Sequence, residues 1–274
     1  MLFFNMHSIW LRCSAALAFA VLAGCSTVNL QSQQKNTEDV REQSLQPKLL
    51  LLGEQHDAPS HPRLHAQAVQ DLASQGRLAS LVLEMVDEHV GADKLRSHAT
   101  EEQVQTALRW REDAWPWANY KGAVMAAVRS GAPVMGASLS QHSIKQAMQS
   151  KDYEAYFTPT LWQRQLDAIR IGHCDMLPAS QLGPMARVQV ARDLTMAWAM
   201  LSQMSPANAQ GKTVVLIAGS GHVDAQLAVP LHISRIDPSA TMQITQWPRE
   251  DTGTDYCAQF KQQMQKMGKP ALRN

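Results

Sequence analysis

The sequence has almost no excess of charge of either sign. Its 274 residues contain 25 Lys and Arg against 24 Asp and Glu, so the formal net charge is +1 at pH 7. Without residues 1–24, whose only formally charged side chain is Arg12, the two signs balance. A general nucleic-acid-binding protein carries a basic excess. The balance therefore argues against a nucleic-acid partner.

Features that define several large protein classes are also missing. The composition, 45% hydrophobic and 18% charged with no internal repeat, excludes collagen, coiled coils and wholesale disorder. No Gly-x-Ser-x-Gly elbow is present, which disfavours a serine hydrolase. The glycine-rich turn Gly219-Ser220-Gly221 has neither the full dinucleotide fingerprint nor the lysine of a phosphate-binding loop. What remains is a globular protein of another class.

The apolar run near the start of the chain is too short to cross a bilayer. It covers residues 15–22, whereas a membrane-spanning helix needs about 20 apolar residues. This length is typical of the hydrophobic region of a signal peptide. The run ends in Leu-Ala-Gly-Cys25, which resembles a bacterial lipobox, in which the cysteine is acylated and becomes the mature N-terminus. An ordinary signal peptide with an incidental cysteine is the alternative.

The chain is accordingly divided into three predicted parts. Residues 1–24 are a lipoprotein signal peptide, and residues 25–47, polar with few apolar groups, are a disordered tether. Residues 48–268 form the folded domain. Ser26 rather than Asp follows the cysteine, which by analogy with lipoprotein sorting favours the outer membrane, with the domain facing the periplasm.

Cysteine is scarce, and two of the four cysteines belong to the predicted leader. Cys13 leaves with the signal peptide and Cys25 takes the lipid. Cys174 and Cys257 remain in an oxidising compartment, where a disulfide can persist. Two interpretations stay open at this point: the two form a disulfide, or they are independent buried thiols.

Short apolar runs bounded by glycine or polar residues predict buried parallel strands. We expect strands at residues 48–52, 81–83, 134–137 and 213–217, and an alternating edge strand at 241–246. We expect helices at residues 62–74, 87–112, from Asn119 to 129, 141–150, 159–171, 185–204 and 257–267.

Alternating strands and helices predict an α/β fold, a parallel sheet flanked by helices. The stretch 141–205 between the third and fourth strands is too long for a single crossover. Part of it is therefore expected to form a smaller helical subdomain beside the sheet.

Polar groups follow three of the predicted strands. Glu54 and His56 follow the first, Glu84 the second and His222 the fourth. Ligands of open parallel sheets bind beyond the carboxyl ends of the strands, so these side chains are expected to share a cleft. They could perform acid–base work, with Glu54 and Glu84 as catalytic candidates. Alternatively, His56, Glu84 and His222 could bind a metal.

The other histidines carry weaker signals. His61 and His65 have the i, i+4 spacing of a metal-ligand pair, but that spacing alone usually has no functional meaning. His232 is interpreted as a surface residue. For His222 the alternative is a hydrogen-bonded structural group.

Several short motifs, in this order along the chain, resemble the ChaN family of iron-regulated lipoproteins within the wider Tiki/TraB-like superfamily. They are Leu-Gly-Glu54-Gln-His56-Asp57, Glu84-Met85, Trp117 with Tyr120, His173-Cys174, Gln189 with Arg192-Asp193, Met196-Ala197 and Ala218-Gly219-Ser220-Gly221-His222-Val223.

The resemblance spans residues 48–235 and implies a function. It implies haem binding linked to iron uptake at the outer membrane, an α/β core, a possible homodimer, and an outer-membrane haem or iron receptor as a possible partner. The superfamily also includes members proposed to be metal-dependent proteases. Here Glu54 and the Gly-Ser-Gly-His222 sequence match the positions on which that proposal rests.

Haem requires an apolar slot for its macrocycle, polar contacts for its two propionates and an axial ligand. Tyr120 is the first candidate ligand because its position resembles the family's, and His173 and His222 follow. Arg187 or Arg192 could bind a propionate in bidentate fashion. The cofactor-binding set predicted from the sequence comprises Glu54, His56, Tyr120, His173, Arg192 and His222.

Two functions of different classes therefore remain. The favoured one is a lipid-anchored haem-binding protein of iron or haem uptake. The other is a metal-dependent hydrolase that uses zinc or manganese in the cleft of Glu54, His56, Glu84 and His222. A third possibility is an envelope scaffold whose polar cleft is vestigial.

Overall fold

The computed structural model describes residues 49–204 and 211–267 of the chain. The predicted signal peptide, the acylated Cys25 and the predicted tether lie outside these described residues. Within the described ranges, none of the helices combines the length and apolar character that crossing a membrane requires.

The core of the fold is a five-stranded sheet in which every neighbouring pair is parallel. The strand order is β3-β2-β4-β1-β5. The strands are β1 (Leu49–Glu54), β2 (Leu78–Asp87), β3 (Val134–Ser138), β4 (Thr213–Gly219) and β5 (Met242–Gln246). The predicted α/β fold is confirmed, and so is the position of the last strand at an edge.

The central strands form where the sequence is continuously apolar. Every residue of β4 is buried, and so are five of the six residues of β1. A strand covered on both faces reads as an unbroken apolar run, because successive side chains point to opposite faces. This is why the runs at 49–52 and 213–217 locate the middle of the sheet.

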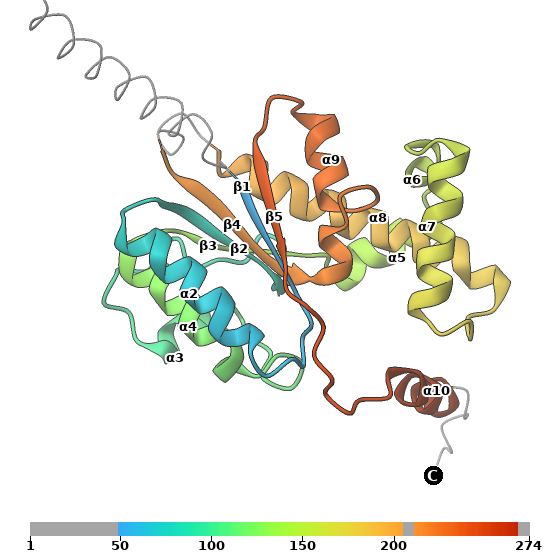
Figure 1. Cartoon of the computed structure of the whole chain (residues 1–274), viewed down its shortest axis with the longest axis horizontal. Helices are drawn as coiled ribbons and strands as arrows, with labels where there is room; N and C mark the ends of the chain where they lie inside the picture. Colours follow the sequence, from blue (N-terminus) through green and yellow to red (C-terminus); the bar gives the residue numbers. More distant parts are fainter. Residues whose placement is uncertain (1–48, 205–210, 268–274) are drawn as a thin grey trace, which may run out of the picture. The chain divides into compact units, whose positions relative to one another are not determined.

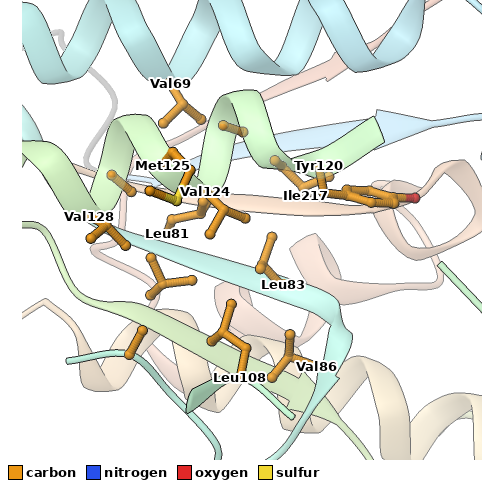
Figure 2. Close-up of a cluster of buried hydrophobic side chains, with 14 of the residues drawn as sticks. Val69, Leu81, Leu83, Val86, Leu108, Tyr120, Val124, Met125, Val128 and Ile217 are labelled. Carbon is orange, nitrogen blue, oxygen red and sulfur yellow. The ribbon is translucent and has the colours of Figure 1, made fainter. Parts of the chain in front are cut away.

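Helices cover both faces of the sheet (Figure 1). On one face lie α2 (His61–Ser74), α3 (Glu101–Ala107) and α4 (Trp117–Ser130), and on the other lie α8 (Ala179–Ser202) and α9 (Val229–Ile236). Figure 2 shows the first layer, where Val69 of α2 and Val124 of α4 pack above Leu81 of β2 and Ile217 of β4. A separate apolar cluster forms between α8, α9 and the opposite face.

The stretch between β3 and β4 builds the helices beside the sheet. These are α5 (Gln141–Gln149), α6 (Asp152–Ala155) and α7 (Pro159–Gly172), followed by α8. The first three contact α8, and Leu139, Ala147, Val188 and Ala191 form their small apolar cluster. Helix α8 is thus shared between the sheet and this helical group.

Three helix predictions were wrong in extent. Helix α8 begins at Ala179, whereas its start was expected at residue 185. Residues 87–112 were expected to be helical, but only α3 is, because β2 continues to Asp87 and Gly91 then bridges to Met135 at the sheet edge. Helix α3 starts where Thr100 and its partner Gln103 form a reciprocal capping box.

Helix α4 begins at Trp117 rather than after Asn119. Pro116 occupies the N-cap, and Gly131 ends the helix in the left-handed conformation, at φ 77°.

Beyond β4 the chain makes a short 3₁₀ turn, η1 (Ser220–Val223), and later α9, which the sequence did not reveal. After β5 the described chain ends in α10 (Tyr256–Met267).

Candidate functional site

The carboxyl ends of β1, β4 and β2 meet at one edge of the sheet because these three strands are direct neighbours. Glu54, the last residue of β1, lies in register with Gly219, the last residue of β4. Glu84 lies near the end of β2, and His222 lies in the turn after β4. The structure thus brings together the four side chains that the sequence placed in one cleft: Glu54, His56, Glu84 and His222.

Glu54 is a buried carboxylate with three partners. Its Oε1 accepts hydrogen bonds from the Tyr120 hydroxyl at 2.6 Å and pairs with His56 Nδ1 at 2.7 Å, while its Oε2 lies 2.7 Å from His65 Nε2. Burial alone would raise the pKa of Glu54, but the His56 and His65 contacts outweigh it and lower this pKa to about 2. Glu54 is therefore an anion that orients three surrounding side chains.

A second carboxylate, Glu84, is partly buried and belongs to a separate branch of the network. Its Oε2 accepts the Gly219 N–H at 2.6 Å, and its Oε1 lies 3.3 Å from His222 Nε2. His222 Nδ1 lies 2.5 Å from Asp193 Oδ1, on α8. The imidazole of His222 is thus held between two carboxylates.

The pKa values of all three groups in this branch are shifted. Burial opposes ionisation of His222, but the Glu84 and Asp193 charges raise its pKa to about 10. The pKa of Glu84 falls to about 2, because the charge of His222 overcomes its burial. Burial raises the pKa of Asp193 to about 6.

His56 stands where the two branches meet. Its Nδ1 contacts Glu54, and its Nε2 lies 4.0 Å from Glu84 Oε2. Burial lowers the pKa of His56, but hydrogen bonding to Glu54 and the charge of Glu84 raise it above the ordinary value overall. The side chain is 39% exposed, against 2% for Glu54, and the edge of its ring packs on Trp115 with centroids 4.8 Å apart. His56 is thus the member of the network that a ligand can reach.

A cavity of about 690 Å³ opens above this network. Glu54, His56, Glu84, Gln189 and His222 contribute to one side of its lining. Four further lining residues come from the end of the described chain: Arg249, Thr254, Tyr256 and Gln259. A volume of this size is typical of small-molecule and cofactor sites.

The other predicted haem contacts lie elsewhere. Tyr120 is only 1% exposed and lies behind Glu54, so it is not part of the cavity lining. His173 lines an adjoining cavity of about 420 Å³, and its Nδ1 is 2.7 Å from the carbonyl oxygen of Ile169. Arg192 lines neither cavity, and Arg187 is bound to Glu154 and to the Met148 carbonyl oxygen.

The sequence interpretation missed two members of the network, a histidine and an aspartate. It also placed one other histidine wrongly at the surface. His65 was given no function, yet it is fully buried against Glu54. Asp193 was noted only as part of a motif. His232 was expected at the surface but is completely buried. The i, i+4 spacing of His61 and His65 was the one signal that could have drawn attention to this face of α2.

The predicted zinc or manganese site receives no support. Across the described parts of the chain, no three or more His, Cys, Asp or Glu side chains are arranged to hold a metal ion. His222 has both ring nitrogens directed at carboxylates, and 4.0 Å separates His56 Nε2 from Glu84. These groups satisfy one another rather than converge on a vacant centre.

Cys174 and Cys257 form a disulfide, with their Cα atoms 5.7 Å apart. The bond joins the end of α7 to the start of α10. The sequence left open a disulfide or two independent buried thiols, and the structure contains the disulfide.

Fold and site together define a class: an α/β protein with a polar ligand cavity at the carboxyl edge of a parallel sheet. A family model described as haem-binding uptake, Tiki superfamily, ChaN matches residues 40–233. Because the match covers well over half of the chain, this protein belongs to the ChaN family.

Solved structures agree on the fold. The chain is similar to the structure described as cofacial haem binding to ChaN of Campylobacter jejuni, with a TM-score of 0.60 and 24% identity over 78% of this chain and 87% of that one. The type III effector HopBA1 gives a TM-score of 0.34 and 19% identity over 64% and 67% of the two chains, too distant a likeness to carry an argument. No curated protein matches the chain.

Proposed function

We propose that this protein binds haem in the cavity above His56, as part of iron or haem uptake. The observation that carries the proposal is a cavity of about 690 Å³ with a carboxylate-oriented imidazole in its lining, in a member of a haem-binding family. When bound, haem would supply a redox-active iron, and the described lining would supply an imidazole, polar and charged side chains and the ring of Tyr256.

The residues present fit an iron-bound haem. A histidine that ligates a metal commonly gives its other ring nitrogen to a carboxylate, which fixes its tautomer and orientation. His56 has this arrangement, with Nδ1 on Glu54 and Nε2 directed away from it. We therefore assign His56, in place of Tyr120, as the residue that would hold the haem iron.

Tyr120 and His65 act on this ligand indirectly. Both contact the carboxylate of Glu54, which in turn holds His56. Burial and the nearby Glu54 charge raise the pKa of Tyr120, so its phenol stays protonated and donates to the carboxylate. Both are positioning residues in this proposal.

The test is a titration of purified protein with haem, followed by the shift of the Soret band. Wild type is expected to saturate with a defined stoichiometry, and His56→Ala to bind at least tenfold more weakly, because it loses the iron ligand. His98→Ala, which removes an exposed histidine outside the cavity lining, is the matched control. A wild type that shows no saturable shift refutes the proposal.

The anchoring of the protein is a separate part of the proposal. We propose that Cys25 is acylated and tethers the domain to the periplasmic face of the outer membrane, since a lipobox-like sequence precedes it. Incorporation of labelled palmitate into wild type but not into Cys25→Ser tests this. Label retained in the variant contradicts it.

We also propose that haem exchange involves protein partners, namely a second copy of this chain or an outer-membrane haem or iron receptor. The mass of the haem-loaded protein by light scattering tests the first. A monomer both with and without haem contradicts the homodimer.

A further inference from the structure

The described chain beyond β5 crosses the cavity, and it lies outside the 40–233 range that matches the family. We call residues 247–260 the C-terminal strap. We propose that this strap is a wall of the ligand site and that its Arg249 binds an acidic group of the ligand. Resting on the proposed haem binding, the inference identifies that group as a haem propionate.

The strap is held at one end by the residues on either side of His56. Asp57 accepts hydrogen bonds from Thr252 at 2.8 Å, Thr254 at 3.0 Å and the Tyr256 hydroxyl at 2.6 Å. These contacts hold the pKa of Asp57 well below its usual range, against the opposing effect of burial. The turn that presents His56 to the cavity is therefore also the turn that holds the strap.

Gln55 adds a second attachment on the same turn. Its side-chain amide donates to the Glu250 carbonyl oxygen at 3.1 Å, and its Oε1 accepts the Glu250 N–H at 3.0 Å. This reciprocal pair fixes the backbone next to Arg249.

The other end of the strap is fixed covalently. Cys257 is bonded to Cys174, two residues after Gly172, which itself lines the cavity. Phe260 packs edge-on against His173, with ring centroids 5.2 Å apart. The strap thus runs from the end of β1 to the end of α7, with the cavity between.

Arg249 is the cation that this wall contributes. The described lining includes the acids Glu54, Asp57 and Glu84, and within it Arg249 is the only Lys or Arg. Among the described residues, no carboxylate forms an ion pair with its guanidinium, and Asp57 of the same lining is engaged by hydroxyls of the strap. The guanidinium lies 5.8 Å from the centre of the Tyr256 ring.

This arrangement suits a carboxylate ligand. A guanidinium binds a carboxylate through two parallel hydrogen bonds, and an aromatic neighbour limits the orientations that it samples. The acids of the lining repel a ligand carboxylate elsewhere in the cavity. Arg249 therefore defines the edge at which the acidic side of the ligand lies.

The experiment compares two ligands, iron protoporphyrin IX and its dimethyl ester, which has no free propionate. We expect Arg249→Gln to weaken binding of the free acid about tenfold and to leave binding of the ester unchanged. Arg129→Gln, which removes a guanidinium of α4 that does not line the cavity, should change neither. Thermal melts confirm that each variant is folded.

The outcomes separate this inference from the proposed function. If wild type binds neither porphyrin, haem binding itself fails and the inference fails with it. If wild type binds haem and Arg249→Gln binds it equally well, only the assignment of Arg249 is overturned. Equal losses for acid and ester also overturn it, because the contact then does not involve the propionate.

Discussion

His232 is a buried histidine without a hydrogen-bond partner. Both of its ring nitrogens are buried and unsatisfied within the described structure. The ring packs against Tyr156 and Phe157, with centroids 5.4 and 5.8 Å away. Burial, and then the charge of Arg235, lower its pKa to about 4. The native state therefore requires the neutral imidazole, whereas the unfolded chain takes up a proton near pH 6.5.

This difference predicts a loss of stability in acid. The stability linked to His232 is fully present above pH 6.5 and is lost as the pH falls from 6.5 through 4. The loss at pH 5 is about 2 kcal/mol. Urea unfolding of wild type and His232→Phe at pH 7.5 and pH 5 measures it. The variant should lose less stability than wild type between the two pH values, by about that amount. His142→Gln, at an exposed position, should follow wild type. Parallel losses in all three proteins would contradict the assignment.

Gly219 sets the distance between the sheet and His56. A Cβ at this position would lie 2.7 Å from His56 Nε2 and 3.5 Å from Glu84 Oε2. Its backbone angles, φ −56° and ψ 146°, are open to alanine, so only the contact opposes a side chain here.

Gly219→Ala is therefore expected to displace the His56 ring with little loss of fold stability. Haem affinity should fall several-fold while the melting temperature changes little. Gly183→Ala is the control, because Gly183 does not line the cavity and a Cβ there would make only an ordinary contact, 3.5 Å from the Arg187 side chain. Equal haem affinity in both variants would show that the position of the His56 ring does not matter to the site.

At the scale of the single element, helix α10 depends on a covalent attachment, the Cys174–Cys257 disulfide. Its sequence is polar and its residues are mostly exposed, so little apolar burial holds it in place. The Cys174–Cys257 bond closes a loop with a sequence separation of 83 residues. By the chain-entropy account, such a cross-link stabilises the native state by about 4.5 kcal/mol at most, and native disulfides typically contribute 2–4 kcal/mol.

Cys257→Ser should lower the free energy of unfolding by about that typical amount, 2–4 kcal/mol. Reductant should lower wild type to the level of the variant and leave the variant unaffected. Cys174→Ser/Cys257→Ser should be no less stable than the single variant. Peptide mass mapping without reduction that finds both thiols free would contradict the bond itself.

The elements were predictable where local pattern and tertiary packing agree. The runs that became β1 and β4 are buried on both faces, so composition alone located them. The segment 87–112 failed because its helical spacing competes with an extension of β2 and a bridge to β3, which depend on partners distant in the sequence. Helix α10 was anticipated, but its role in the site was not.

The part of the site that follows strands was predictable from the sequence, and the part that comes from helices and the strap was not. Glu54, Glu84 and His222 follow strands, and the topology of parallel sheets brings such residues together. His65 and Asp193 reach the site from the sides of α2 and α8, and Arg249 reaches it along the strap. The spacing from His61 was only a weak signal for His65, and no local signal marks Arg249, because these positions depend on how helices and a terminal segment pack.

The whole molecule has nearly balanced charge, but the charge is not evenly distributed. Carboxylates and histidines are concentrated at the carboxyl edge of the sheet, and the strap adds a guanidinium opposite them. This polarity suits a ligand that has a metal centre at one point and acids at another. Haem is such a ligand, and it is the ligand that the family's description names.

The most direct test is a crystal structure of the haem complex that locates iron by its anomalous signal. The account predicts an iron peak within bonding distance of His56 Nε2, with a propionate beside Arg249. An iron peak in the adjoining cavity next to His173, or on any side chain away from His56, would contradict it.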